Sequence, residues 1–276
     1  MDQYCVLGNP VEHSKSPWIH ARFAQLTGQQ LEYGKQLIAL DGFDAAIEAF
    51  RAAGGKGCNI TVPFKFQAAP LATTLTERAR LAQACNTLRF DAGGAVYADN
   101  TDGVGLVNDI QGNAGVTIAG CELLLIGAGG AAAGVLGPLV EARPKRIVVT
   151  NRTLDKAQSL VERHAALARE HGVGLSAAAL DEVGGPFDIV VNATASSLSG
   201  AGIPVADGVL KPGTLAVDMM YGPAADGFMA WARAHGAVPR DGLGMLVEQA
   251  AEAFQVFRGV RPPSARVLAE LRAGLD

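Results

Sequence analysis

Short apolar runs alternate with helical stretches through the first hundred residues of the chain. Residues 4–7, 31–39 and 57–62 are rich in apolar side chains, whereas residues 17–26 and 43–53 carry the spacing of helices. Strands that are separated by helices of this length favour a mostly parallel sheet with right-handed crossovers. The pattern therefore predicts a βαβαβ unit at the start of the chain.

A second unit of the same kind begins further on. An apolar strand at residues 122–126 leads through a glycine turn into a helix at 131–141 and a strand at 146–150. Further apolar runs at 187–191 and 214–217 predict two more strands of this unit.

The segment between the two units, residues 98–105, is polar and opens a predicted helix at 104–110. Beyond Pro239 the sequence is helical to its end, with one apolar stripe formed by Met245, Leu246, Ala250, Ala253, Phe254 and Phe257. We therefore expect an α/β protein of two domains: a mostly parallel or mixed first domain over residues 1–102 and a Rossmann-like, doubly wound domain over 103–239. A cleft separates them, and the helices of 240–276 pack back on the first domain.

Length and charge limit the possible partners. The 276 residues are 49% hydrophobic, carry a formal charge of -4 and have a pI near 5.8. Binding to nucleic acid or to an anionic membrane surface needs clustered Lys and Arg, and the sequence offers no such cluster. We expect a small-molecule substrate, no nucleic acid and no membrane partner, in a monomer or a homodimer.

Targeting and metal signals are also absent from the sequence. The chain opens with residues 1–3 directly before an apolar strand, without a basic leader, and no apolar run is long enough to span a bilayer. We expect a cytoplasmic protein. The four cysteines, at 5, 58, 85 and 121, form no C-x-x-C pair, and the five histidines lack the spacing of metal ligands, so we expect reduced cysteines and no metal site.

The glycine turn of the second unit carries a specific signal. Residues 127–132 fit G-x-G-x-x-A directly between a strand and an alanine-rich helix. The first glycine permits a tight turn, the second lets the backbone approach a pyrophosphate, and the helix N-terminus offers free N–H groups to the phosphates. This context predicts a dinucleotide site formed by Gly127, Ala128, Gly129, Gly130 and Ala131.

The end of the following strand predicts which dinucleotide binds. An acidic residue there would accept hydrogen bonds from the 2′-hydroxyl of NAD, but this strand ends in Asn151, Arg152 and Thr153. Arg152, with Thr153 and with Lys156 one turn later, can meet a 2′-phosphate with charge-assisted hydrogen bonds. The expected cofactor is therefore NADP, although a solvated surface Arg and Lys is the alternative interpretation of such a pair.

Polar groups also follow several strands of the first domain. Ser14 and Ser16 lie in a loop before a helix that Pro17 can begin, a setting that suits a carboxylate or, alternatively, ordinary helix capping. Further polar segments are residues 57–65, 85–88 and 100–105. Ligands of open α/β sheets bind beyond the carboxyl ends of strands, so these segments can converge on one crevice.

Six motifs occur here in the order found in shikimate dehydrogenases, which the chain resembles over essentially its whole length. They are H-S-x-S-P at 13–17, N-x-T-x-P-x-K at 59–65, N-T-L at 86–88, N-T-D-G at 100–103, the glycine loop, and N-R-T at 151–153. Residues 218–221 and 241–250 agree with the same family. The chain differs from the usual family pattern at Ala21, Gln83 and Ala98.

The resemblance implies a role for each matching position. It implies that Ser14 and Ser16 hold a substrate carboxylate, and that ring hydroxyls are bound, or the pocket shaped, by Asn59, Thr61, Asn86, Tyr221 and Gln249. Lys65 and Asp102 resemble the catalytic pair. Met219, Gly242 and Glu77 correspond to positions beside the nicotinamide. The first domain would then bind the substrate and the second NADP.

Hydride transfer from an alcohol requires a base within hydrogen-bond reach of the reacting oxygen. Lys65 suits that role, and Asp102 can hold it, although an ordinary surface ion pair is the alternative. The expected reaction is NADP-dependent, reversible reduction of 3-dehydroshikimate to shikimate in the biosynthesis of aromatic amino acids. A quinate or aminoshikimate dehydrogenase, and a non-catalytic sensor that binds the metabolite and NADP, are the alternatives.

Overall fold

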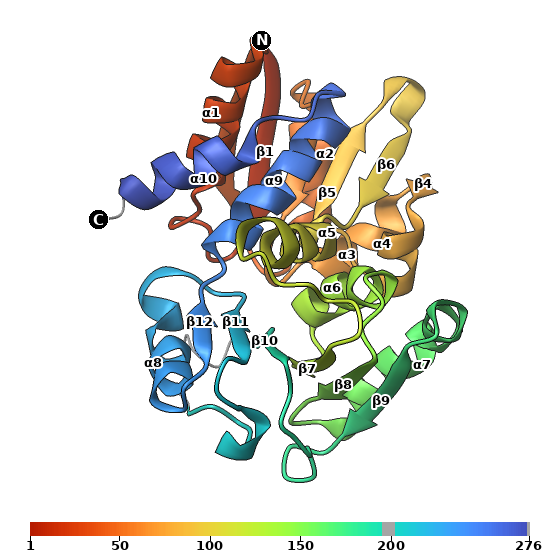
Figure 1. Ribbon diagram of the computed structural model, residues 1–276. Coiled ribbons are helices and arrows are strands. Elements are labelled where there is room, and N and C mark those ends of the chain that lie inside the picture. The colour runs from red at the N-terminus through yellow and green to blue at the C-terminus, as the bar shows by residue number, and fades with distance from the viewer. Residues whose placement is uncertain (195–201, 275–276) are drawn as a thin grey trace. The chain divides into compact units, whose positions relative to one another are not determined.

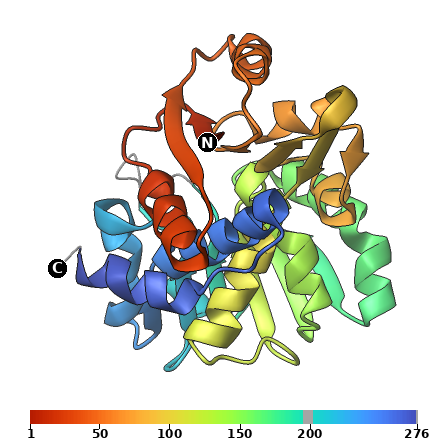
Figure 2. The same ribbon diagram turned by 90° about the horizontal axis from the view of Figure 1, so that it is seen from above.

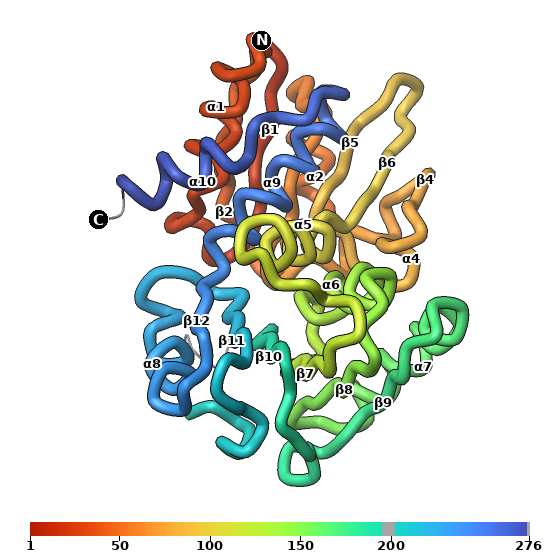
Figure 3. Tube along the Cα trace, viewed as in Figure 1, coloured from red at the N-terminus to blue at the C-terminus, as the bar shows by residue number. Residues whose placement is uncertain are grey.

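The computed structural model describes residues 1–194 and 202–274 (Figure 1). The chain forms two compact units, one made of Met1–Gly105 and Leu246–Asp276 and the other of Leu106–Met245. One boundary falls within helix α5 (Asp102–Asn108) and the other within helix α9 (Leu243–Arg258), so these two helices carry the chain out of the first unit and back into it, as the trace in Figure 3 shows.

The sheet of the first unit is mixed. In spatial order its strands are β2 (Leu31–Leu37), β1 (Asp2–Gly8), β3 (Gly57–Ile60), β5 (Thr87–Phe90), β6 (Val96–Asp99) and β4 (Thr74–Leu75). Strands β2, β1 and β3 are parallel, as predicted, because α1 (Ser16–Thr27) and α2 (Phe43–Ala52) supply the crossovers. Strands β3, β5 and β6 pair antiparallel, since only a short turn joins β5 to β6.

Alternation along these strands separates two faces of the sheet. On one face the core is apolar and includes Leu7, Phe43, Ile60, Phe64 and Leu88. The other face is covered by α9, where the rings of Tyr4 and Phe257 lie 4.8 Å apart. This second face also receives Asn59 and Thr87, which are partners in the register of β3 and β5.

Three further α-helices belong to the described part of the first unit. Two short ones, α3 (Lys65–Ala68) and α4 (Glu77–Ala82), follow strands β3 and β4. The last, α10 (Ser264–Ala273), lies beside α1 (Figure 2), and an ion pair of 2.6 Å joins Arg22 to Glu270.

The sheet of the second unit is parallel throughout the described strands. Its order is β12 (Val238–Arg240), β11 (Leu215–Asp218), β10 (Ile189–Asn192), β7 (Glu122–Ile126), β8 (Arg146–Thr150) and β9 (Gly174–Ala178). The order reverses between β7 and β10, as in a doubly wound fold, with helices α6 (Gly130–Glu141), α7 (Leu154–His171) and α8 (Asp226–Ala234). The predicted α/β class and Rossmann-like second unit are confirmed.

No helix in the described parts of the chain is both long and apolar enough to cross a membrane.

Candidate functional site

Lys65 and Asp102 form an ion pair in the first unit. Lys65 is the first residue of α3, just after β3, and Asp102 is the first residue of α5, just after β6. Lys65 Nζ lies 2.5 Å from Asp102 Oδ2, and the two side chains are only 14% and 7% exposed. Because both groups are largely withdrawn from water, the pair differs from the exposed ion pairs that contribute little to stability.

Asn86 joins this pair to its surroundings. Its Nδ2 donates to Asp102 Oδ1 and to Thr101 Oγ1, both at 2.9 Å, and lies 3.3 Å from Gln249 Oε1 on α9. The structure thus brings four predicted residues, Lys65, Asn86, Asp102 and Gln249, into one hydrogen-bonded group. Thr101, which also belongs to this group, lies within the N-T-D-G motif but received no role from the sequence.

The other two predicted residues near β3 differ in their surroundings. Asn59 is 7% exposed, and its amide is bonded to other protein groups through both its nitrogen and its oxygen. Thr61 follows the strand and donates its backbone N–H to the Leu7 carbonyl at 2.9 Å. A Cβ on Gly8 would lie 2.2 Å from Thr61 Cγ2, so glycine at position 8 is what allows the two chain segments to approach.

Ser14 and Ser16 lie between β1 and α1. Ser14 Oγ accepts a hydrogen bond of 3.3 Å from the Ser16 N–H, and Ser16 is buried at the first position of the helix. The N-cap residue of α1 is Lys15, which makes no side-chain capping bond. Neither serine is the N-cap residue itself, but Ser14 Oγ accepts the first backbone N–H of the helix, which is the capping role that the sequence offered as the alternative.

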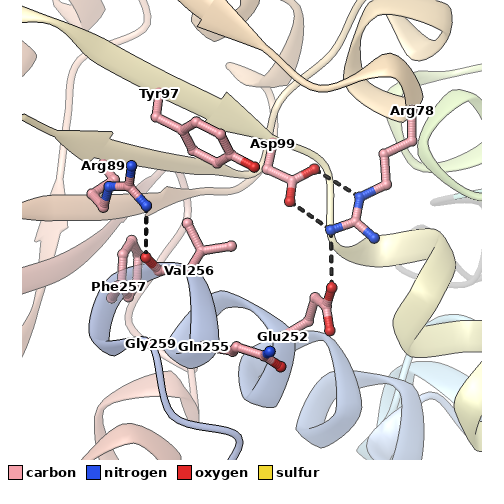
Figure 4. Close-up of a pocket in the computed structure, with 9 residues that line it drawn as sticks. All are labelled: Arg78, Arg89, Tyr97, Asp99, Glu252, Gln255, Val256, Phe257 and Gly259. Carbon is pink, nitrogen blue, oxygen red and sulfur yellow. Dashed lines mark hydrogen bonds and ion pairs between the residues drawn. The ribbon is translucent and has the colours of Figure 1, made fainter.

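A pocket of about 470 Å³ in the first unit is lined by residues of α4, of β5 and β6, and of the C-terminal part of α9 (Figure 4). Within it Arg78 forms ion pairs with Asp99, at 2.5 Å, and with Glu252 of α9, at 3.0 Å. Asp99 Oδ1 accepts the N–H of Asn100 at 2.7 Å, and Asn100 Oδ1 accepts the N–H of Asp102 at 3.2 Å. These ion pairs hold the turn before Asp102 in place. The sequence offers no reason to single out Arg78, because an Arg in a helix is usually a solvated residue.

The glycine loop has the backbone that a dinucleotide site requires. Gly127 adopts a φ of +116°, and a Cβ there would lie 3.1 Å from the Ala193 carbonyl oxygen. A Cβ on Gly129, in contrast, would meet no described atom within 4 Å. Gly129 is the N-cap of α6, which has neither a side-chain cap nor an acidic residue in its first turn. The open, uncapped helix end, with Ala128, Gly130 and Ala131 around it, fits a pyrophosphate.

The segment after β8 presents exposed cations. Asn151 Nδ2 donates to the Thr153 carbonyl at 2.9 Å, which shapes the turn before α7. Arg152 and Lys156 are exposed, and neither forms an ion pair among the described residues. Both side chains are thus available to an anionic group.

Met219 and Gly242 lie against each other at the ends of β11 and β12. Met219 donates its N–H to the Asn192 carbonyl at 3.0 Å, and Gly242 donates its N–H to the Met220 carbonyl at 2.8 Å. A Cβ on Gly242 would lie 2.3 Å from the Met219 carbonyl oxygen, so only glycine fits there. Tyr221 follows in the same segment of the second unit, partly buried.

Glu77 is the one residue predicted to contact the cofactor that belongs to the first unit. It belongs to α4 of the first unit, is exposed, and pairs with Arg80 at 2.5 Å. That pairing lowers the pKa of Glu77. Among the described residues, no group of three or more His, Cys, Asp and Glu side chains is arranged to hold a metal ion.

Family models match three stretches of the chain. Residues 6–88 match the shikimate dehydrogenase substrate binding domain, residues 110–200 match shikimate / quinate 5-dehydrogenase, and residues 242–272 match the shikimate 5′-dehydrogenase C-terminal domain. A protein of Paracidovorax citrulli (strain AAC00-1), named shikimate dehydrogenase (NADP(+)), is 65% identical over 274 residues, which cover 99% of this chain and 98% of that protein.

Solved structures resemble the chain over nearly its full length. An Ael1 enzyme from Pseudomonas putida is 45% identical with a TM-score of 0.89, and the match covers 98% of each chain. The shikimate 5-dehydrogenase of Thermus thermophilus, solved in complex with NADP(H) and shikimate, is 29% identical with a TM-score of 0.85 and covers 99% of each chain.

Proposed function

Because this chain belongs to the shikimate dehydrogenase family, we propose that it catalyses the reversible, NADP-dependent reduction of 3-dehydroshikimate to shikimate. The family implies a place for this reaction in the biosynthesis of aromatic amino acids. Within the structure, the main support for the proposal is the largely buried ion pair of Lys65 and Asp102, in which Asn86 donates a hydrogen bond to the same carboxylate.

This pair supports proton transfer at a substrate hydroxyl. One N–H of Lys65 is engaged with Asp102 Oδ2 at 2.5 Å, which orients the amine while its remaining hydrogens or lone pair face elsewhere. In the oxidative direction neutral Lys65 takes the hydroxyl proton, and in the reductive direction its ammonium form donates a proton to the developing alkoxide. Asp102 holds the amine and accepts a hydrogen bond from a neighbouring hydroxyl.

The remaining polar groups of the first unit suit a polyhydroxylated acid. The serine hydroxyls of the loop before α1, Ser14 and Ser16, bind the carboxylate in this proposal. Thr61, Asn86 and Gln249 bind ring hydroxyls, together with Tyr221 of the second unit, and Asn59 shapes the pocket. We accordingly assign substrate binding and acid–base chemistry to residues 1–102 and to the C-terminal helices, and NADP binding to residues 103–239.

The second unit offers the groups that NADP needs. Its uncapped α6 terminus and Gly127 suit the pyrophosphate, and Arg152 with Thr153 and Lys156 suits the 2′-phosphate. Met219 and Gly242, and Glu77 of the first unit, are assigned to the nicotinamide end. When bound, NADP carries the hydride that the reaction transfers. A cytoplasmic location and a monomeric or homodimeric state stay predictions.

A quinate or aminoshikimate substrate is the second candidate in the same chemical class. The family model matched by residues 110–200 is described for both shikimate and quinate, which favours quinate as the competitor to test. A sensor that binds the metabolite without turnover is the candidate of another class, and the presence of both Lys65 and Asp102 speaks against it.

Nicotinamide absorbance at 340 nm tests these possibilities directly. The purified chain is assayed with shikimate and with quinate, each with NADP and with NAD, and in the reverse direction with 3-dehydroshikimate and NADPH. We expect the highest kcat/KM for shikimate with NADP. Activity confined to quinate with NAD would overturn both the substrate and the cofactor, and binding of shikimate and NADP without any absorbance change over a wide pH range would establish the sensor instead.

A further inference from the structure

A chain of buried and partly buried hydrogen bonds begins at Tyr33 on β2 and reaches the Lys65–Asp102 pair. The Tyr33 hydroxyl donates to Asn59 Oδ1 at 2.7 Å. Asn59 Nδ2 in turn donates one hydrogen to the Asn86 carbonyl and one to Thr87 Oγ1, both at 3.0 Å. Both N–H groups of the Asn59 amide are therefore spent within the protein, and neither is left for a ligand.

Thr87 extends the hydrogen-bonded chain to Asn86. Its hydroxyl has a single hydrogen, and because Asn59 Nδ2 has no lone pair to accept it, that hydrogen goes to Asn86 Oδ1 at 2.9 Å. The backbone N–H of Thr101 donates to the same oxygen, also at 2.9 Å. These two donors, with Thr101 Oγ1 at 3.2 Å, fix the oxygen end of the Asn86 amide, on a residue that is only 2% exposed.

The orientation of this amide determines what Asp102 meets. With its oxygen held by Thr87 and Thr101, Asn86 turns its nitrogen to Asp102 Oδ1 at 2.9 Å. A reversed amide would set an oxygen against the carboxylate and an NH₂ group against two donors, which is unfavourable at both ends. The other oxygen of Asp102 then remains for Lys65 Nζ.

We propose that Tyr33, Asn59 and Thr87 are positioning residues, which set the amide of Asn86 and through it the carboxylate that holds Lys65. The inference rests on the proposed roles of Lys65 and Asp102. It assigns Asn59 to the support of the site and not to substrate contact, and it adds Tyr33 and Thr87, to which neither the motifs nor the family models give a role.

Substitution of Thr87 tests the proposal most directly. Thr87→Val keeps the shape of the side chain but removes both hydrogen bonds, whereas Thr87→Ser keeps the hydroxyl. We expect Thr87→Val to lower kcat about tenfold or more and to raise the KM for shikimate by a smaller factor, because the reacting groups lose alignment while Asn86 is the only proposed substrate contact that is disturbed. Thr87→Ser is expected to recover most of the loss.

The pH profile separates positioning from loss of folding. In Thr87→Val the pH dependence of kcat/KM for shikimate oxidation should differ from that of the wild type, since the carboxylate that holds Lys65 is less firmly placed. Thr73→Val is the matched control. Thr73 lies in the same unit, and its hydroxyl donates to the Val96 carbonyl at 3.0 Å and accepts the Val96 N–H at 2.7 Å, so this variant should lose stability without a change in the profile.

A second variant and a double-mutant cycle also test the positioning role. Should Thr87→Val not fold, Tyr33→Phe removes only the first bond of the chain and is expected to lower kcat about two- to fivefold. The free energies of unfolding of Tyr33→Phe, Thr87→Val and the double variant should be non-additive, because both residues act on the amide of Asn59.

Wild-type kcat and pH profile in Thr87→Val, or strictly additive free energies in the cycle, would overturn the positioning role. Absence of turnover in the wild-type chain would instead count against the proposed function, and the cycle would still decide whether Tyr33 and Thr87 are coupled through Asn59.

Discussion

His20 is a buried base that the first unit holds in its neutral state, so protonation of this side chain opposes folding. It lies on α1, is 1% exposed and is surrounded by aromatic rings. Its ring stacks on that of Tyr33 with 4.0 Å between the ring centroids, and it also contacts Phe23, Phe254 and Phe257. None of these neighbours carries a charge, and burial keeps the pKa of Tyr33 well above its usual range. Desolvation by burial therefore lowers the pKa of His20 from 6.5 to about 3.

The pKa of His20 predicts how stability depends on pH. The unfolded state binds a proton near pH 6.5 and the folded state only near pH 3, so stability is full above 6.5 and is lost as the pH falls toward 3. Between pH 7 and pH 5 the unfolded state alone gains the proton, which should reduce the free energy of unfolding by about 2 kcal/mol.

Tryptophan fluorescence isolates the unit concerned. The chain has two tryptophans, Trp18 on α1 of the first unit and Trp231 on α8 of the second. In a Trp231→Phe background, urea unfolding followed at Trp18 reports on the unit that contains His20. The comparison is made with and without His20→Leu, at pH 7 and at pH 5.

Comparing the variants with and without His20→Leu cancels the contributions of the other groups that titrate in acid. Burial also lowers the pKa of His164, which lies in the second unit, and Glu270 has a pKa lowered to about 2 by Arg22, so its effect falls below pH 4.5. The loss of about 2 kcal/mol should be present with His20 and absent with His20→Leu. An equal loss in both, within about 0.5 kcal/mol, would refute the assignment to His20.

Three substitutions test the two units separately. In steady-state assays Lys65→Ala should lower kcat about 10²- to 10⁴-fold with little change in the KM for shikimate, whereas substitution of the exposed Lys56 by Ala should leave kcat and KM unchanged. An unaltered kcat in Lys65→Ala would show that Lys65 takes no part in the chemistry. Arg152→Ala should raise the KM for NADP about tenfold or more and leave the KM for NAD nearly unchanged, with Arg169→Ala on the following helix as the control. Equal effects on the two cofactors would mean that Arg152 does not bind the 2′-phosphate. Gly242→Ala should lower the free energy of unfolding of the second unit in urea by about 1–3 kcal/mol, because its Cβ would lie 2.3 Å from a backbone oxygen. Gly112→Ala, whose Cβ would meet nothing within 4 Å, should leave that free energy unchanged, and comparable losses in the two variants would contradict the steric argument.

The strands that the sequence predicted best are those buried on both faces. Strands β7 and β8 coincide with the predicted 122–126 and 146–150, because a central parallel strand reads as an unbroken apolar run. Strands β4 and β6 of the first sheet, and β9 and β12 of the second, were missed. Strands β9 and β12 lie at the edges of their sheet, β9 is made mostly of small residues, and β12 contains Pro239, which an edge strand tolerates because it lacks one neighbour.

The motifs also identified the residues that gather around Lys65, but not the ones behind them. Lys65, Asn86 and Asp102 are polar residues at strand ends, where polar groups suggest a ligand. Thr87 and Tyr33 belong to the residue types that strands favour in any case, so their presence in a sheet carries no signal. Asn86 and Gln249 are 163 positions apart, and only the packing of α9 on the sheet brings them within 3.3 Å.

The aromatic cluster and the hydrogen-bonded chain meet at one side chain, which decides how the pH experiments are interpreted. Tyr33 offers its ring to His20 and its hydroxyl to Asn59. Because burial keeps His20 neutral down to about pH 3, the stack that supports Tyr33 has the same charge throughout the pH range of a turnover assay. A shift of the catalytic profile in Thr87→Val therefore cannot arise from His20. We expect such a shift to come from the other end of the chain, where Asn86 and Asp102 hold Lys65.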